Sequence, residues 1–197
     1  MRMRFWGILA FVMGTVTSVF AQQNDAKYLV AGAVPVTEEG RVEFVDTIAA
    51  AGKTQAELYE LMKTYVENDI VNGPEHLPQA RVTQLTPEEG LIVASIEENL
   101  WFKRKAFVSD FSRFFYQLIF ETKDGEVKIT MRNLHYLYDN TEQTDKYASF
   151  RAEEWITDKE AIHRSGTKLK KITGKFRRAT IDRKDAIFEG AEKVVVK

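Results

Sequence analysis

Three histidines, His76, His135 and His163, are the side chains of this sequence best suited to hold a metal ion. A metal-binding helix places two such ligands a few residues apart, so that both lie on one face. No two of these histidines lie that close in the chain. We therefore interpret them as structural or surface residues, and the sequence predicts no metal site.

Adjacent carboxylates suggest acid–base chemistry, and three such pairs occur: Glu88–Glu89, Glu97–Glu98 and Glu153–Glu154. Neighbouring side chains diverge on a strand and on a helix, so a pair does not converge on one substrate atom. General acid–base catalysis also requires a cleft and a perturbed pKa, which no sequence pattern displays. We expect the third pair to serve as first-turn acids that favour a helix N-terminus.

Nucleophiles are not found in a catalytic context. Ser165 precedes Gly166 without the G-x-S-x-G pattern, the chain has no cysteine, and it has no glycine-rich phosphate loop. We predict no catalytic residue and no cofactor, and we expect that the protein is not an enzyme.

Basic and aromatic residues are the remaining candidates, and their chemistry is that of binding. One basic cluster spans residues 103–105 and a second spans residues 168–184. Either could dock an anionic partner, a membrane face or an acidic polysaccharide, and either could be a solvated face balanced by acids elsewhere. The candidate interaction surface consists of Lys175, Arg177, Arg178, Trp155 and Tyr136.

A sheet must position these residues, and its clearest part runs from Phe107 to Tyr138. Apolar residues alternate over 114–120, and Asp124-Gly125 then reverses the chain, which is the pattern of an antiparallel hairpin. On the return strand the apolar phase slips from odd to even positions, which predicts a bulge near Arg132 and Asn133. The aromatic side chains of this stretch could line a ligand groove, but their alternation favours a core.

The chain before the hairpin predicts a short strand followed by a helix. The strand is expected over residues 42–44 and ends at the small residues 49–52. Thr54 and Glu57 then match a capping box, and apolar side chains over 58–66 recur at helical spacing, which predicts one stripe that packs on a sheet.

A loop and further strands lead from this helix to the hairpin. Two prolines within residues 72–78 exclude a continued helix and predict a surface loop. Strands are expected over 81–85 and 91–96. Polar residues at 97–99 interrupt the second strand, and both one long bent strand and two short strands fit the pattern.

The chain after the hairpin predicts a polar loop and two helices. The loop covers residues 139–146, the first helix covers 153–162, and the second covers 175–194 with apolar residues at helical spacing. The order strand, helix, strands, helices indicates an α+β domain, in which about five antiparallel strands carry helices packed on one face.

The first residues have the pattern of a cleaved secretory signal. Arg2 and Arg4 precede an apolar run that ends at Phe20, and small residues around Ala21 suit a signal peptidase. An uncleaved anchor is the alternative. We therefore expect a signal peptide over 1–21 that is cleaved after Ala21, a partly ordered lead-in over 22–39 and a single domain over 40–197. The mature chain is then expected to lack a stable membrane span.

Composition excludes several classes of partner and anchor. The absence of cysteine excludes disulfides and excludes the lipid anchor that bacterial lipoproteins carry after their signal. The chain has 28 basic and 29 acidic residues, and cleavage of the signal removes two arginines. The mildly acidic balance that remains argues against a nucleic-acid partner.

Two phrases near the C-terminus resemble a known family. They are Glu153-Glu154-Trp155-Ile156-Thr157-Asp158-Lys159 and Gly174-Lys175-Phe176-Arg177-Arg178-Ala179-Thr180-Ile181-Asp182. The chain is similar here to the DUF4468 family, exported Bacteroidota proteins of unknown function with a TBP-like fold, and the predicted elements follow the family's order. The resemblance implies a TBP-like domain of the Gram-negative envelope. It implies no activity and no site residues, and the TBP-like shape by itself does not imply DNA binding.

We therefore expect a non-enzymatic binding module that is periplasmic or secreted. Its partner would be an envelope protein or ligand, bound at the basic C-terminal helix or at the open face of the sheet through Phe115, Ile119, Leu134 or Tyr136. The alternative is a carrier of a small molecule or glycan, with a pocket between helix and sheet.

Overall fold

The computed structural model describes residues 25–106, 108–138 and 148–197. The signal predicted over 1–21 and the polar loop predicted over 139–146 lie outside these ranges. The lead-in predicted over 22–39 is described from Asp25 onward, and it buries Tyr28 and Val34 in the core.

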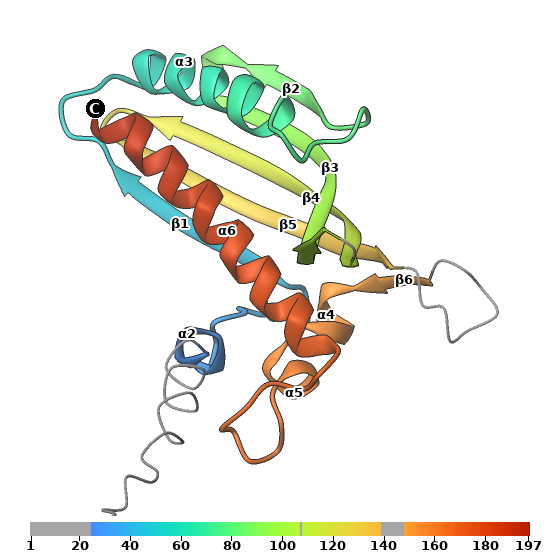
Figure 1. The fold of residues 1–197 in the computed structure, drawn as a ribbon. Coiled ribbons are helices and arrows are strands. Elements are labelled where there is room, and N and C mark those ends of the chain that lie inside the picture. Colours follow the sequence, from blue (N-terminus) through green and yellow to red (C-terminus); the bar gives the residue numbers. More distant parts are fainter. Residues whose placement is uncertain (1–24, 107, 139–147) are drawn as a thin grey trace, which may run out of the picture.

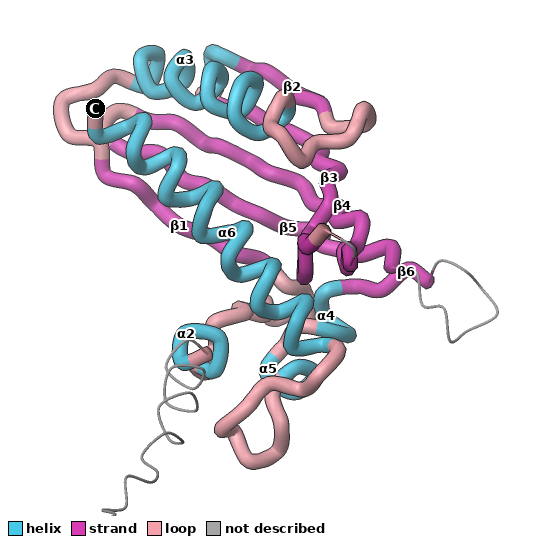
Figure 2. Tube along the Cα trace, viewed as in Figure 1, coloured by secondary structure: helices cyan, strands magenta, loops and turns pink. Residues whose placement is uncertain are grey.

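A six-stranded antiparallel sheet forms the centre of the described structure (Figures 1 and 2), as the sequence predicts for an α+β domain. The strand order is β1-β5-β4-β3-β2, and β6 pairs with the far end of β5. The strands are β1 (Glu43–Ala49), β2 (Arg81–Thr86), β3 (Leu91–Lys105), β4 (Val108–Lys123), β5 (Glu126–Tyr138) and β6 (Ala148–Arg151).

The β4–β5 hairpin has the predicted turn and the predicted bulge. Gly125 takes a positive φ of 78° in the turn, which a residue without a Cβ adopts at low cost. Phe115 lies opposite His135 but Gln117 lies opposite Arg132, so β5 has one extra residue. Asn133 is at this bulge and has a φ of 58°. The bulge keeps the even-numbered residues after it on the same face as the odd-numbered residues before it.

β3 is one long strand rather than two short ones. It runs for 15 residues, pairs with β4 along most of its length, and has a bulge between Trp101 and Lys103. The bulge allows β3 to bend while its hydrogen bonding to β4 continues on both sides of the bulge.

Two long helices cover one face of the sheet (Figure 1). Helix α3 begins at the predicted capping box, where the Thr54 N–H donates to the Glu57 carboxylate at 2.8 Å. Helix α6 crosses the sheet beside it, and three short helices lie near its first turns. The helices are α2 (Ala26–Leu29), α3 (Gln55–Tyr65), the π-helix η1 (Val66–Val71), the 3₁₀ helix η2 (Pro87–Glu89), α4 (Ala152–Trp155), α5 (Asp158–Ala161) and α6 (Thr173–Val196).

The single helix predicted over 153–162 is wrong, because the chain forms α4 and α5 with a break between them. Ile156 ends the first helix and Thr157 is extended, with a ψ of 163°. The break turns the Ile156 carbonyl away from a helical partner and toward the Arg177 guanidinium, which donates to it at 2.8 Å. A tertiary hydrogen bond thus replaces a local one.

The core lies between the sheet and the two long helices. Phe114, Leu118 and Phe120 of β4 belong to the same core cluster as Leu58 and Met62 of α3, and all five side chains are fully buried. In the part of the chain that the structure describes, buried side chains therefore occupy the space between helices and sheet, where the carrier alternative requires a pocket.

Two residues expected on the open face lie in this core instead. Leu134 is 2 % exposed and Tyr136 is fully buried, because the bulge brings both to the covered face. Phe115 and Ile119 do lie on the uncovered face and are partly exposed.

Candidate functional site

Arg177, predicted to lie on an interaction surface, is fully buried. Its guanidinium donates to the Tyr28 carbonyl at 2.6 Å and to the Ile156 carbonyl at 2.8 Å, and it forms an ion pair of 2.8 Å with Asp158. A buried guanidinium requires such partners. Arg177 thus joins the lead-in to the C-terminal helices and is not available to a partner, so this surface assignment is wrong. The assignment of Tyr136 is wrong for the same reason, since its hydroxyl is buried against Thr180.

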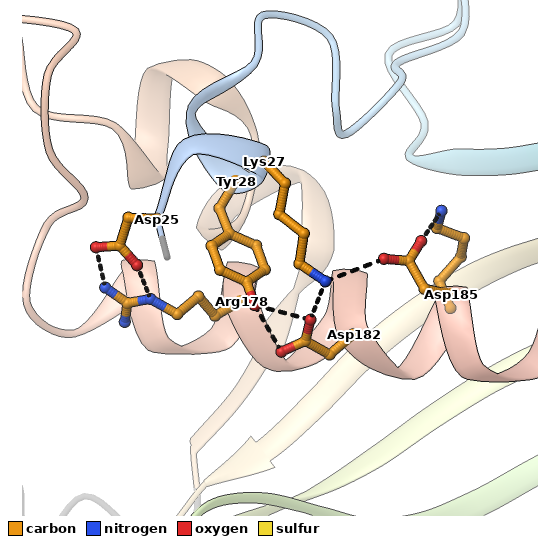
Figure 3. Close-up of polar contacts among 7 residues, drawn as sticks. Asp25, Lys27, Tyr28, Arg178, Asp182 and Asp185 are labelled. Atoms are coloured by element: carbon orange, nitrogen blue, oxygen red, sulfur yellow. Dashed lines mark hydrogen bonds and ion pairs between the residues drawn. The ribbon is translucent and has the colours of Figure 1, made fainter. Parts of the chain in front are cut away.

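Arg178 is engaged with the lead-in (Figure 3). Its guanidinium donates to both carboxylate oxygens of Asp25, at 2.6 and 2.8 Å. The hydrogen bond from Arg178 lowers the pKa of Asp25 below its ordinary value of 3.8. Beside this pair, Lys27 and Tyr28 both contact the Asp182 carboxylate. The basic face of α6 therefore docks the protein's own N-terminal segment.

Lys175 and Trp155 belong to an aromatic cluster at the start of α6. The Lys175 ammonium pairs with Asp110 at 2.7 Å and lies 4.5 Å from the centre of the Phe102 ring. Trp155 packs edge-on against Phe176, with ring centres 4.6 Å apart. Both side chains are half-buried, so the five predicted residues do not form one common surface.

Glu97 and Glu98 diverge to opposite faces of β3, as the sequence predicts. Glu97 pairs with Arg113 at 2.5 Å, and Glu98 pairs with Arg183 at 2.7 Å beneath α6. The Tyr116 hydroxyl also donates to Glu98, and burial raises the pKa of that phenol well above 10. An arginine thus neutralises each carboxylate, and neither is placed to act as a free base.

The uncovered face of the sheet mixes apolar, aromatic and charged side chains. Ile119 lies across from Val93 on β3 and Thr130 on β5. Phe115 stacks on the His135 ring at 4.5 Å, with only 5° between the ring planes. This face offers contacts of several kinds, but the arrangement by itself specifies no partner.

A cleft opens beside this face, at the junction of β1, β5 and β6. We call it the arginine cleft, and its volume is about 490 Å³. Its lining includes three arginines, two glutamates and polar residues of the β5 bulge: Arg41, Arg132, Arg151, Glu43, Glu153, Asn133, His135 and Ser149.

The strand register explains why the cleft lies there. Along the outer side of β5, β1 pairs up to Arg132 and β6 begins to pair at His135. No residue of β1 or β6 lies opposite Asn133 and Leu134, so the bulge leaves a gap between the two strands. The Glu153 carboxylate accepts the Val42 N–H at 2.8 Å and thereby holds α4 against the beginning of β1.

The arginines of this cleft differ from the arginines of α6, which form ion pairs with carboxylates of the protein. Arg41, Arg132 and Arg151 are exposed, and none forms an ion pair within the part of the chain that the structure describes. Arg132 donates one hydrogen bond, from Nε to Gln117 at 2.8 Å. No described residue accepts a hydrogen bond from the remaining guanidinium N–H groups of these three arginines, which can each donate to a ligand.

A second cavity, of about 640 Å³, lies beside α5. Most of its charged residues contact other described residues: Lys170 donates to the Lys159 carbonyl at 3.0 Å, Lys159 pairs with Glu160, and Asp158 pairs with Arg177. This cavity therefore offers fewer free groups than the arginine cleft.

The described residues contain no group of three His, Asp or Glu side chains that could hold a metal ion. Among the helices described, none is both long and apolar enough to cross a membrane.

The sheet is the part of the chain with a family match. Residues 44–137 match the model described as "Domain of unknown function (DUF4468) with TBP-like fold". The predicted resemblance to DUF4468 is confirmed. No curated protein matches the chain.

Two solved structures extend the comparison beyond the matched segment. A DUF4468 family protein from Bacteroides ovatus superposes with a TM-score of 0.76 at 28% identity, covering 87% of this chain and 94% of that one. A TBP-like protein from Parabacteroides distasonis gives a TM-score of 0.65 at 16% identity, covering 84% and 98%. The second likeness shows the fold alone.

The arginine cleft lies at the border of the DUF4468 match. Arg132, Asn133 and His135 are within residues 44–137, whereas Arg41 and Arg151 lie on either side. The sequence signalled only the bulge, through the phase slip near Arg132 and Asn133. The three arginines are far apart in the chain, and no spacing pattern could have identified them as one site.

Proposed function

We propose that this protein is an exported, non-enzymatic binding module of the cell envelope that holds its ligand in the arginine cleft. The observation that carries the proposal is the convergence of three exposed arginines without ion-pair partners among the described residues, on a cavity of about 490 Å³. Sites of a few hundred cubic ångströms with a few convergent polar groups are typical of ligand binding.

Export is supported by the signal pattern over residues 1–21. Cell fractionation and N-terminal sequencing test this part of the proposal. We expect the mature chain in the periplasm or medium, beginning at Gln22. A chain recovered with Met1 in the cytoplasm would contradict export.

A non-enzymatic role is supported by the way the acid–base candidates are engaged. Glu97 and Glu98 are paired with arginines, His135 is stacked on Phe115, and His163 contacts Ser165. Among the described residues, no hydrogen bond joins His135 to Ser149, the hydroxyl residue that also lines the arginine cleft.

Site-specific crosslinking in the producing cells tests the binding role. A photoreactive residue replaces Ser149, an exposed residue of the cleft, and in a control chain it replaces Glu189, an exposed residue of α6. We expect a reproducible adduct from position 149 that is lost when Arg132→Gln and Arg151→Gln are added. Identical adducts from both positions would show that the cleft is not the binding site.

A further inference from the structure

Building on the proposed function, we infer that the arginine cleft binds an oxyanion group of its ligand, a carboxylate or a phosphate. Arg132 and Arg151 hold the group from the two sides of the β5 bulge, and Arg41 approaches from the segment before β1. The inference names the chemistry of the ligand that the cleft accepts.

The strand register places the two principal arginines on one face. Arg132 is the Cα partner of Glu43 on β1, and Arg151 is the Cα partner of His135 on β5. Paired residues project their side chains to the same side of a sheet. Since Arg132 and His135 both lie on the uncovered side of β5, Arg132 and Arg151 flank the gap from the same side.

The balance of charge in the cleft favours an anion. Three arginines line it together with two glutamates, and the Glu153 carboxylate already accepts the Val42 N–H. Guanidinium groups present a planar fork of donors that matches the two oxygens of a carboxylate or phosphate. Three arginines against two glutamates leave the cleft with a net positive charge, which favours an anion over a cation.

The bulge adds a polar group between the arginines. Asn133 is exposed, lines the cleft, and is held in the left-handed conformation with a φ of 58°. Bulges frequently re-aim a side chain near a functional site. Asn133 follows Arg132 directly in the chain, and its side-chain amide has N–H groups that can donate to an anion in the cleft.

The cavity is larger than a simple anion needs. A volume of about 490 Å³ falls within the range of small-molecule sites. We therefore assign to the cleft a ligand whose oxyanion group is attached to a body of small-molecule size.

Anion titration of the ¹⁵N-labelled mature protein, followed by NMR, tests this inference. The probes are sodium phosphate in one arm and sodium acetate in the other, both at constant ionic strength to hold screening fixed. We expect saturable shifts of the Asn133, Leu134 and His135 amides. Stronger binding of phosphate would indicate a phosphorylated ligand, and binding of acetate at least as strong would indicate a carboxylate.

Three substitutions locate the binding. Arg132→Gln and Arg151→Gln should each weaken it about fivefold, or about 1 kcal/mol. The matched control is Arg81→Gln, an exposed arginine in the same row of the sheet, since Ser95 and Gln117 connect it to Arg132 in register. Arg81 lies three strand spacings, or about 14 Å, from Arg132. Its loss should therefore leave anion binding unchanged.

A gain of binding provides a test that misfolding cannot imitate. Glu43→Gln removes a negative charge from the cleft and should tighten anion binding about threefold, because the repulsion between Glu43 and the anion is lost. No saturable shift with either anion, or equal losses in the Arg81 and Arg132 variants, would overturn the inference.

The two proposals fail in different ways. A specific crosslinked adduct at position 149, without anion binding in the NMR titration, would overturn the oxyanion inference and leave the binding role standing. Anion binding without any capture in cells would support the oxyanion site and contradict the proposed function.

Discussion

Arg183 and Glu98 form a bidentate ion pair beneath α6, and both N–O distances are 2.7 Å. Glu98 is only 2 % exposed, and the Tyr116 hydroxyl donates to the same carboxylate at 3.0 Å. The pair joins the middle of α6 to β3 across the apolar core. It fixes how the helix sits on the sheet, because a shift along the helix axis would separate the paired charges from their partners.

Removal of the Glu98 carboxylate should therefore destabilise the fold. We expect Glu98→Ala to lower the free energy of unfolding by about 2–3 kcal/mol, because Arg183 is left beneath the helix without a partner. Urea denaturation measures the change. Glu189→Ala breaks the exposed pair with Lys193 and should cost less than about 0.5 kcal/mol. Similar losses in the two variants would contradict a special role of the buried pair.

Arg177 should attach the N-terminal segment to the domain. We expect Arg177→Met to lower the free energy of unfolding by about 3 kcal/mol, since the carbonyls of Tyr28 and Ile156 lose a charged donor. Limited proteolysis should then cut within residues 26–34, a segment that should stay protected in the wild-type protein because Tyr28 and Val34 are buried. Arg178→Gln is the comparison, because it removes the partly exposed pair with Asp25 and a cation–π contact with Tyr28 but leaves the buried contacts of Arg177 in place. Equal protection of the Met variant and the wild type would refute this attachment.

The pair between Asp25 and Arg178 should depend on pH. The folded protein lowers the pKa of Asp25 below 3.8, mainly through the hydrogen bond from Arg178. Its stabilisation is thus fully present above the pKa of the unfolded chain and is lost as the pH falls through the lower folded pKa. We expect at most about 1 kcal/mol, because both side chains are partly exposed.

An NMR titration of the Asp25 carboxyl group measures this pKa directly. Its midpoint should rise in Arg178→Gln, and the stability difference between wild type and Asp25→Asn should vanish at low pH. An unchanged midpoint would mean that Arg178 is not the cause of the shift.

Gly190 of α6 should tolerate alanine only if Tyr65 is changed as well. A Cβ at this position would collide with the Tyr65 hydroxyl, which donates to the Ile187 carbonyl at 2.8 Å. Gly190→Ala should therefore destabilise the protein by about 1–2 kcal/mol, despite the better helix propensity of alanine.

Tyr65→Phe should remove most of that penalty, because it deletes the colliding oxygen. A double-mutant cycle in urea measures the coupling between the two positions. Additive effects would show that the hydroxyl does not limit the approach of α6 to α3.

Features that depend on near neighbours were predictable from the sequence. The capping box at Thr54 and Glu57 and the Asp124-Gly125 turn are formed by residues within a few positions of one another. The bulge near Asn133 was visible because the alternation of apolar residues changes phase there. In each case the spacing of apolar residues or the residue types of the turn indicate the local backbone conformation.

The candidate site was not predictable in this way. Arg132 and Arg151 meet only because β6 joins β5 beyond the end of β1, and Arg41 reaches them from another part of the chain. The break between α4 and α5 was missed for the same reason, since the Ile156 carbonyl is satisfied by Arg177 rather than by its own helix.

The sequence by itself determined the class of the fold, its hairpin and the start of α3, because these follow from periodicity and local hydrogen bonds. Only the tertiary structure decided which basic side chains form ion pairs within the protein and which have none among the described residues. Arg177 and Arg178 belong to the most basic stretch of the chain, yet the lead-in supplies carbonyls and a carboxylate that engage them. Arg132 and Arg151 form no ion pair among the described residues, although the strand register places Glu43 opposite Arg132.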